Sequence, residues 1–411
     1  MYNVGALLGG IANDKFGFFY GQIISVIPNV LGFVLFAFIE ENEQLIWAAW
    51  PLAALGMPAP HFMNMQFCRL GRQYYTSTVA FMGACNIAAA SVTLIMELMR
   101  ESGMSYTEIF FIWAVARVAI VTVRLILLTP TTIPVTVDEE YTVFDHRYLR
   151  CCKDKDDEAT AKDEVATKDV QNEEDGETFK VILVNYQFYV AVLAIAIYAL
   201  RASTFISWLG AGWPEWVAAG FMNETSTDDD YREFSRTINS FMSIGNLAVI
   251  FVNMLSGAIV DICRRRSDDD RIGSANGLMI CYFVVALCSA GVSILSSFRV
   301  EWTAYAAVVS VLLGRGFSSL WGPMIQLLFP IKFFGATFGI ICLVQIPVNM
   351  LSVPMLAYNK ENDDFSVMSY VFLGMGVVIF LLPFVMWSFK RQVTKIGTVR
   401  ASDNGEETSA L

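Results

Sequence analysis

Three arginine residues lie inside long apolar stretches of this sequence. Arg117 and Arg315 fall near the middle of their stretches, and Arg201 falls nearer one end. A guanidinium stays charged and binds a carboxylate through two parallel hydrogen bonds. No Asp or Glu lies at a comparable depth to neutralise these charges. A carboxylate on a bound ligand could complete them, so we predict Arg201 and Arg315 as ligand-binding residues.

Each of these two arginines also has a structural interpretation. The Arg201 side chain could extend along the helix to a membrane interface, because its aliphatic part tolerates apolar surroundings. Arg315 stands between Gly314 and Gly316 and could bond the backbone carbonyl groups of a broken helix. Arg117 has no pattern around it that favours a binding role.

Neutral polar residues form a second group of candidates. Asn86 lies in the middle of an apolar stretch, where its amide could bond an amino-acid backbone or the edge of a nucleobase. Asn64 and Gln66 lie near the end of another stretch, where a gating hydrogen bond and a ligand contact are equally reasonable. Such residues commonly join neighbouring helices and contribute about 0.6 kcal/mol each, so structure is the default interpretation for all three.

The composition requires a membrane around these residues. Of 411 residues, 55% are apolar and only 16% are charged, whereas soluble domains have about 25% charged residues. The net charge of −11 argues against a nucleic-acid partner, because phosphate binding needs a basic surface. His61 and His146 are the two histidines, and their isolation argues against a metal centre and a catalytic triad. We therefore expect no enzyme activity, no metal and no cofactor.

The apolar stretches are long enough to cross a bilayer, which takes about 20 residues per helix. Ten full spans are predicted, at residues 17–39, 45–67, 77–98, 106–129, 181–208, 234–260, 275–297, 302–326, 334–357 and 366–389. Residues 1–12 are apolar but too short to span and read as the inner part of a further helix. Prolines inside spans, such as Pro347 and Pro354, suggest kinks. The predicted fold class is an all-α polytopic membrane protein.

A polar segment divides the spans into two groups. Residues 153–177 combine Lys with many Asp and Glu and have almost no large apolar side chain, which is typical of disorder. We predict a helical half at 1–130, a disordered linker at 131–180, a six-helix half at 181–389 and a tail at 390–411.

A proton-coupled carrier needs a buried group that gains and loses a proton. His61 is the one candidate for such a group in the sequence. Facilitated diffusion is therefore the better prediction.

The basic residues predict which loops face the cytoplasm, because short cytoplasmic loops hold most Lys and Arg. The linker, the C-terminal tail and the loops on their side hold nineteen basic residues, against five on the opposite side. The linker and the C-terminus are therefore predicted to be cytoplasmic. Residues 210–233 then lie outside and contain the glycosylation sequon that starts at Asn223.

A short pattern recurs at corresponding places in the two halves. The first copy contains Gly10, Asp14, Lys15 and Gly17, and the second contains Gly257, Asp261 and Arg264. Glycine lets helices approach closely, and an Asp can pair with basic residues or with a helix N-terminus when one side of a carrier is closed. We predict these seven residues as gating residues. The first copy is expected to end one helix and to start the next.

These two copies resemble the signature of the major facilitator superfamily, with Phe18 and Phe19 in place of the usual trailing basic residues of the first copy. More of the chain resembles solute carrier family 43. The residues that carry this resemblance are Asn64 to Gln66, Ser77 and Thr78, Gly83 and Ala84, Arg124 to Pro134, Arg315 to Phe317, Phe329 and Pro330, Phe334 and Gly335, Phe338 and Gly339, and Leu382 and Pro383.

The resemblance implies a facilitator of small neutral organic solutes that works by alternating access in the plasma membrane. Residues 199–201 resemble the branch for large neutral amino acids, whereas residues 64–66 and 124–134 resemble the nucleobase branch. Leucine-type amino acids are the first prediction, since two arginines can hold a carboxylate, and purine nucleobases are the alternative. Matched to this family, the chain lacks the first helix, so a non-transporting regulator of a full-length carrier is a third hypothesis. The expected partners are a small-molecule substrate and the lipid bilayer.

Overall fold

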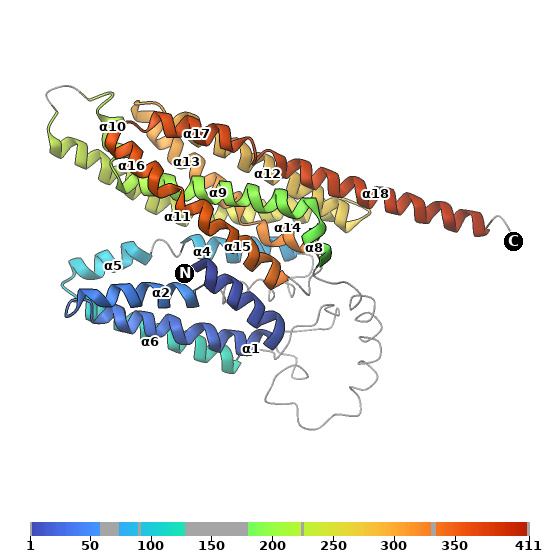
Figure 1. The fold of residues 1–411 in the computed structure, drawn as a ribbon, viewed down its shortest axis with the longest axis horizontal. Helices are drawn as coiled ribbons and strands as arrows, with labels where there is room; N and C mark the ends of the chain where they lie inside the picture. The colour runs from blue at the N-terminus through green and yellow to red at the C-terminus, as the bar shows by residue number, and fades with distance from the viewer. Residues whose placement is uncertain are drawn as a thin grey trace. The chain divides into compact units, whose positions relative to one another are not determined.

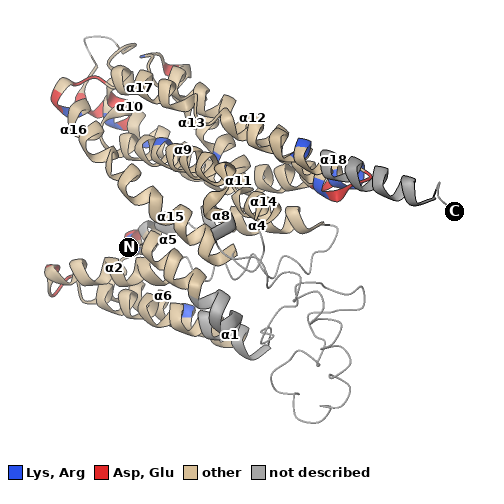
Figure 2. Ribbon diagram, turned by 45° about the vertical axis from the view of Figure 1, so that its right-hand side comes forward, with Lys and Arg blue, Asp and Glu red and all other residues tan. Residues whose placement is uncertain are grey.

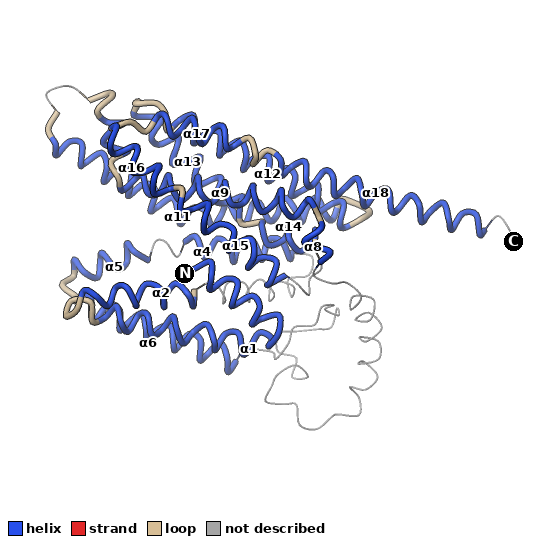
Figure 3. Tube along the Cα trace, in the orientation of Figure 1, coloured by secondary structure: helices blue, strands red, loops and turns tan. Residues whose placement is uncertain are grey.

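The computed structural model describes residues 2–57, 74–88, 92–127, 180–222, 226–329 and 334–408. The described segments are helices joined by loops and turns, with no strand among them (Figure 3). The predicted linker, apart from Lys180, lies outside these residues. By their contacts the residues group into two units, which are described separately below.

The first unit comprises Met1–Arg72, Met96–Tyr189 and Phe329–Leu343. Its elements are α1 (Tyr2–Ala37), the short 3₁₀ helix η1 (Glu43–Leu45), α2 (Ile46–Gly56), α6 (Tyr106–Leu127), α8 (Lys180–Val184) and the first part of α15 (Phe334–Met350). The second unit comprises Gln73–Ile95, Val190–Leu328 and Val344–Leu411. Its elements are α4 (Tyr75–Ala88), most of α9 (Tyr186–Gly210), α10 (Trp213–Ala218), α11 (Asp228–Arg265), α12 (Asp270–Leu295), α13 (Glu301–Ser318), α14 (Trp321–Leu328), the last part of α15, α16 (Ser352–Asn362), α17 (Ser366–Gly376) and α18 (Leu381–Thr408). Helix α5 (Val92–Glu101), which is labelled in Figure 1, contributes residues to both units. Each unit thus takes a segment from the other half of the sequence.

Seven helical segments of the described chain are long and apolar enough to cross a membrane. They are Tyr106–Val123, Tyr186–Gly210, Asp228–Arg265, Asp270–Leu295, Glu301–Leu328, Phe334–Asn362 and Ser366–Thr394. They coincide with the last seven predicted spans. Of the other three, the first contains the apolar helical stretch Gln22–Ala37, and the next two run partly outside the described residues. Figure 2 shows charged residues gathered near helix ends, with long uncharged stretches between them.

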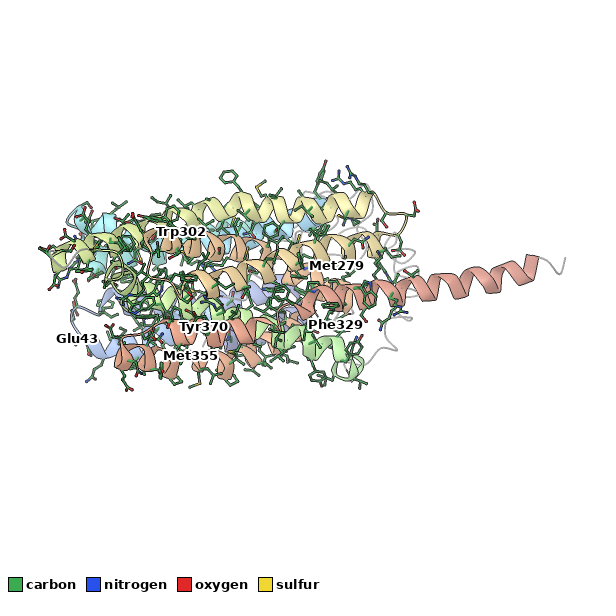
Figure 4. All side chains as sticks on the ribbon, turned by 90° about the horizontal axis from the view of Figure 1, so that it is seen from above. Glu43, Met279, Trp302, Phe329, Met355 and Tyr370 are labelled. Carbon is green, nitrogen blue, oxygen red and sulfur yellow. The ribbon has the colours of Figure 1, made fainter. Side chains whose placement is uncertain are left out.

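The outer surface of these helices is apolar, as a lipid environment requires. Trp302 and Tyr370, both labelled in Figure 4, expose 64% and 57% of their surface. Polar side chains such as Asn253, Ser256 and Ser293 are instead fully or almost fully buried. The polar groups of the spans therefore face protein, which is where a transport site or a helix contact must be built.

Helix α1 reverses direction within its length. A Cβ added to Gly5 would collide with the Leu55 backbone, and one added to the adjacent Gly56 would collide with Ser25 and Asn29. In a straight helix Gly5 and Ser25 would be about 30 Å apart, so they cannot both touch neighbouring residues of α2. The chain turns back between them, as Figure 1 also shows.

The expectation that the stretch from Gly10 to Gly17 ends one helix and starts the next needs a correction. The backbone is assigned as helical without interruption from Tyr2 to Ala37.

Three of the predicted continuous spans are interrupted. In each, the helix that follows the interruption has a proline as its third residue. The breaks lie between α13 and α14, between α15 and α16, and between α17 and α18. Pro323, Pro354 and Pro383 each follow the break. A proline in a helix clashes with the carbonyl group four residues earlier and cannot donate to it. Those positions are residues 319 and 379, which lie in the breaks, and residue 350, which is the last residue of α15. Pro347 stays inside α15.

We expect Gly32→Ala to destabilise the first unit. A Cβ at Gly32 would lie 2.8 Å from the Cα and Cβ atoms of Ala53. Overpacking of this kind costs about 1–3 kcal/mol, so the thermal midpoint of the purified protein should fall. Gly374→Ala is the matched control, because a Cβ there meets nothing within 4 Å. Equal midpoints for the two variants would contradict the close packing of α1 on α2.

Candidate functional site

Asp261 joins the end of α11 to the beginning of α4. Its Oδ1 atom accepts from the Thr76 amide at 3.2 Å, and its Oδ2 atom accepts from the Ser77 amide at 2.8 Å and from the Ser77 hydroxyl at 2.6 Å. Arg264 places Nη2 3.6 Å from Oδ1. Thr76 and Ser77 belong to the first turn of α4, where amide groups lack helical partners and favour a negative charge. We call the contact of Asp261 with Thr76 and Ser77 the Asp261 clamp.

Gly257 makes the Asp261 clamp sterically feasible. A Cβ at this position would lie 2.5 Å from the Ser77 Cα atom and 2.8 Å from the Thr76 carbonyl oxygen. Only glycine lets the two helices approach this closely. Helices α4 and α11 lie side by side in Figures 1 and 2. The structure thus brings Gly257, Asp261 and Arg264 of the second pattern copy together.

The first copy makes a related approach in the first unit. A Cβ at Gly10 would lie 2.7 Å from the Gly335 carbonyl carbon, and one at Gly339 would lie 2.6 Å from the Leu7 Cα atom. Gly335 is the second residue of α15, just as Thr76 is the second residue of α4. Asp14, Lys15 and Gly17 belong to α1, but their side chains lie outside the described part.

A polar centre forms in the second unit where α13 breaks. We define it as Asn246, Asn253, Arg315 and Ser319. The Nη1 atom of Arg315 donates to the Asn246 Oδ1 atom at 2.8 Å, and the arginine is half-buried. With its amide oriented to suit its neighbours, Asn253 donates to Ser319 Oγ and to the Gly316 carbonyl oxygen. The arginine therefore stands beside a neutral amide and a helix break rather than beside an acid.

Two stretches that are distant in sequence meet at the polar centre. The Asn253 Oδ1 atom accepts from the Ala84 amide at 3.3 Å. A Cβ at Gly83 would lie 2.7 Å from the Ser319 Cβ atom. The stretches at 83–84 and 315–317 are distant in sequence, and both reach this point of the fold. The break leaves the Leu320 carbonyl group accessible to the Tyr282 hydroxyl, which donates to it at 2.9 Å.

Asn246 and Asn253 are residues that the candidate set omitted. Asn239, Asn246 and Asn253 recur every seven residues along the predicted span, which places them on one face of a helix. Asn253 is fully buried and Asn246 is 7% exposed. This period of amides in an apolar segment is the sequence signal that could have identified them.

Arg201 lies in the interior of the second unit, 3% exposed. Its Nε atom donates to Ser293 Oγ at 3.1 Å, and its Nη2 atom donates to Ser296 Oγ at 3.4 Å. The guanidinium carbon lies 4.9 Å from the ring centroid of Phe372 and 5.6 Å from that of Trp208. Hydroxyl groups and aromatic faces therefore surround this charge inside the protein, and the side chain does not extend to the protein surface.

The remaining candidates are Asn64, Gln66, Asn86, Asn223 and Arg117. Asn64, Gln66 and Asn223 lie outside the described residues. Asn86 belongs to α4, but its side chain is not described. Arg117 lies in α6, and its buried Nε atom has no hydrogen-bond partner among the described residues. Among all the residues that the structure describes, no group of three or more His, Cys, Asp or Glu side chains could hold a metal ion.

No family model matches the chain, and no curated protein matches it. Solved structures do match. A variant of the E. coli fucose:proton symporter FucP aligns with 94% of this chain and 88% of its own, with a TM-score of 0.55 and 13% identity. FucP in the outward conformation, described as a major facilitator superfamily transporter, gives a TM-score of 0.57 at 15% identity over 94% of this chain and 87% of its own. This chain has the major facilitator superfamily fold.

A third comparison agrees on this fold. The proton:xylose symporter XylE, bound to 6-bromo-6-deoxy-D-glucose, aligns with 95% of this chain and 83% of its own, with a TM-score of 0.57 and 14% identity. Together with the seven apolar helices, the fold identifies an integral multi-pass membrane protein. At these sequence identities the similarity concerns the fold alone. It does not extend to the ligands of those symporters.

Proposed function

We propose that this protein is a facilitative transporter that carries small neutral organic solutes, with large neutral amino acids as the substrate class, by alternating access. The observation that carries the proposal is the half-buried Arg315, which has a neutral amide partner and lies at a helix break inside a span. In transporters, broken helices provide unpaired backbone groups at the substrate site. A substrate carboxylate would supply the negative charge that the described surroundings of Arg315 do not.

The surroundings of Arg315 suit a zwitterionic ligand. The guanidinium keeps donors beyond the one that bonds Asn246, and the amides of the polar centre can bond an amino group. Asn86, Asn64 and Gln66 remain proposed contributors on the basis of sequence. An amino-acid side chain would then contact the apolar residues that make up most of the unit.

Gating is proposed for the Asp261 clamp. It joins helices from the two halves of the sequence, so halves that rock around a central site must break it in each cycle. By the repeat, we propose that Asp14, with Lys15 and Gly17, acts in the same way on the beginning of α15. The Gly10 approach to Gly335 supports this placement.

Uniport, rather than proton coupling, is the proposed mechanism. Among the buried residues that the structure describes, Asp261 is the one carboxylate, and it is occupied by α4 and Arg264. A coupling group must release and regain a proton during transport. We further propose a plasma-membrane location with the linker and C-terminus in the cytoplasm and a glycan on Asn223.

Uptake measurements test this function directly. Cells that express the chain should take up labelled leucine above vector controls, without dependence on a proton gradient. Surface labelling must first confirm delivery to the membrane. Uptake of labelled adenine alone would replace the amino-acid proposal with the nucleobase alternative. If the protein reaches the cell surface and takes up neither substrate, the transport proposal is wrong and the regulatory hypothesis is favoured.

A further inference from the structure

One stripe of α18 changes from apolar to basic along the helix. Residues three or four positions apart lie on the same face of a helix, and Phe384, Trp387, Arg391 and Lys395 have this spacing. Phe384 is 64% exposed, Trp387 is 50% exposed, and Arg391 is exposed as well. The side chain of Lys395 lies outside the described residues. We call these four residues the α18 stripe. An apolar, then aromatic, then basic order is typical of a helix that leaves the lipid core at its aromatic residue.

The positive charge of this stripe is not neutralised within α18. The first acidic residue of the helix is Asp403, well after Lys390 and Arg391. The Lys390 Nζ atom donates to the Asn276 Oδ1 atom of α12 at 2.9 Å, so its partner is an amide rather than an acid. The Arg391 guanidinium carbon lies 5.5 Å from the centroid of the Trp387 ring. Among the described residues, neither basic side chain forms an ion pair.

The acidic residues at the beginning of α12 lie further along the helix pair. Helices α12 and α18 run in opposite directions, because Phe283 meets Phe380 and Asn276 meets Lys390. Asp269, with an acidic residue on either side, precedes Asn276 by seven residues, which is about 10 Å along a helix. Its carboxylate accepts from two backbone amides of the first turn of α12. The positive charge at the level of Lys390 is therefore not cancelled by this neighbouring helix.

We propose that the α18 stripe, together with Lys390, binds one anionic phospholipid of the phosphatidylserine type. The Arg391 guanidinium offers paired donors for phosphate oxygens, and the Lys390 ammonium has donors beyond the one that bonds Asn276. The Trp387 ring would lie at the level of the lipid glycerol, and an acyl chain would lie along Phe384. Basic residues without an acid beside them favour a headgroup with a net negative charge over the neutral headgroup of phosphatidylcholine.

The apolar part of the stripe argues for a lipid rather than a soluble phosphate. A soluble anion gains only from the basic residues, where it competes with water. A phospholipid adds the contact of its acyl chain with Phe384 and Trp387, which are both exposed. Anionic lipids also concentrate in the cytoplasmic leaflet, the leaflet proposed above for this end of the chain. None of these residues belongs to the polar centre or to the Asp261 clamp.

The experiment is a titration of the purified full chain, in micelles of detergent and phosphatidylcholine, with phosphatidylserine that is labelled on its acyl chain. Fluorescence polarisation of the label reports binding. We expect one saturable site for wild type, with an affinity that falls as salt is added. Lys390→Gln combined with Arg391→Gln should weaken binding about 10-fold or more, because charged hydrogen bonds to the phosphate are lost. Trp387→Ala should weaken it less, by about 3-fold.

Matched controls remove the same types of side chain elsewhere in the second unit. Arg236→Gln, at an exposed position of α11, and Trp302→Ala, at a residue of α13 that is 64% exposed, should bind phosphatidylserine as wild type does. Arg391→Lys keeps the charge and should bind more tightly than Arg391→Gln. This variant keeps the test decisive where a glutamine variant fails to fold.

Three results would overturn the proposal. Equal affinity for labelled phosphatidylserine and labelled phosphatidylcholine would mean that only the apolar part of the stripe binds lipid. Equal binding of phosphatidylserine by wild type and by the double glutamine variant would place the lipid elsewhere. Displacement by soluble glycerophosphoserine as effective as that by unlabelled phosphatidylserine would identify a site for free phosphate esters. The titration needs no transport, so its failure is separate from failure of the proposed function.

Discussion

Replacing Asp261 with asparagine is expected to lower the thermal midpoint and to slow leucine uptake about 10-fold or more, because charge-assisted hydrogen bonds contribute about 1.5–3 kcal/mol each. Asparagine has the same shape but only one acceptor oxygen. Its amino group would face either the Thr76 amide or the two donors of Ser77. The variant also loses the charge that complements the first turn of α4 and pairs with Arg264.

The effect on transport follows from the populations of two states. If the Asp261 clamp closes one side of the carrier, its loss shifts the equilibrium away from that closed state by about 10- to 100-fold. Substrate-exchange and net-uptake assays should both report this shift. Asp268→Asn is the matched control, because Asp268 lies a few residues further along and is exposed. Equal transport by the two variants would show that the Asp261 clamp does not open during the cycle.

Arg315→Gln should raise the KM for leucine about 10- to 100-fold, since a substrate carboxylate would lose its charged hydrogen bonds. The maximal rate should change less, and uptake of adenine, if any, should hardly change. Arg315→Lys keeps the charge but loses the planar pair of donors, so an intermediate KM is expected.

A structural role for Arg315 makes a different prediction. Asn246→Ala removes the hydrogen bond that Arg315 donates to α11, at a cost of about 1 kcal/mol. If Arg315→Gln and Asn246→Ala lower the thermal midpoint by the same amount and leave the KM for leucine unchanged, Arg315 only joins two helices. A large KM effect confined to the arginine variants supports a ligand role. Measurement of midpoints and kinetics on the same preparations separates these cases.

The helices themselves were largely predictable from local chemistry. Span length, apolar composition and the position of each proline act through neighbouring residues, and the last seven predicted spans coincide with helices. The breaks before Pro323 and Pro383 follow from the same rule that suggested a kink at Pro354. The reversal inside α1 was expected from the glycines and Asp of the first copy, although its helical backbone was not.

The partners of the polar residues were decided by tertiary structure. Asp261 meets Ser77 across 184 positions of sequence, and Arg201 meets Ser293 across 92. Periodicity shows which face of a helix is polar, as the spacing of Asn246 and Asn253 illustrates, but it does not say which helix covers that face. Packing brings those faces together, because in an apolar environment each buried polar group gains most by finding another.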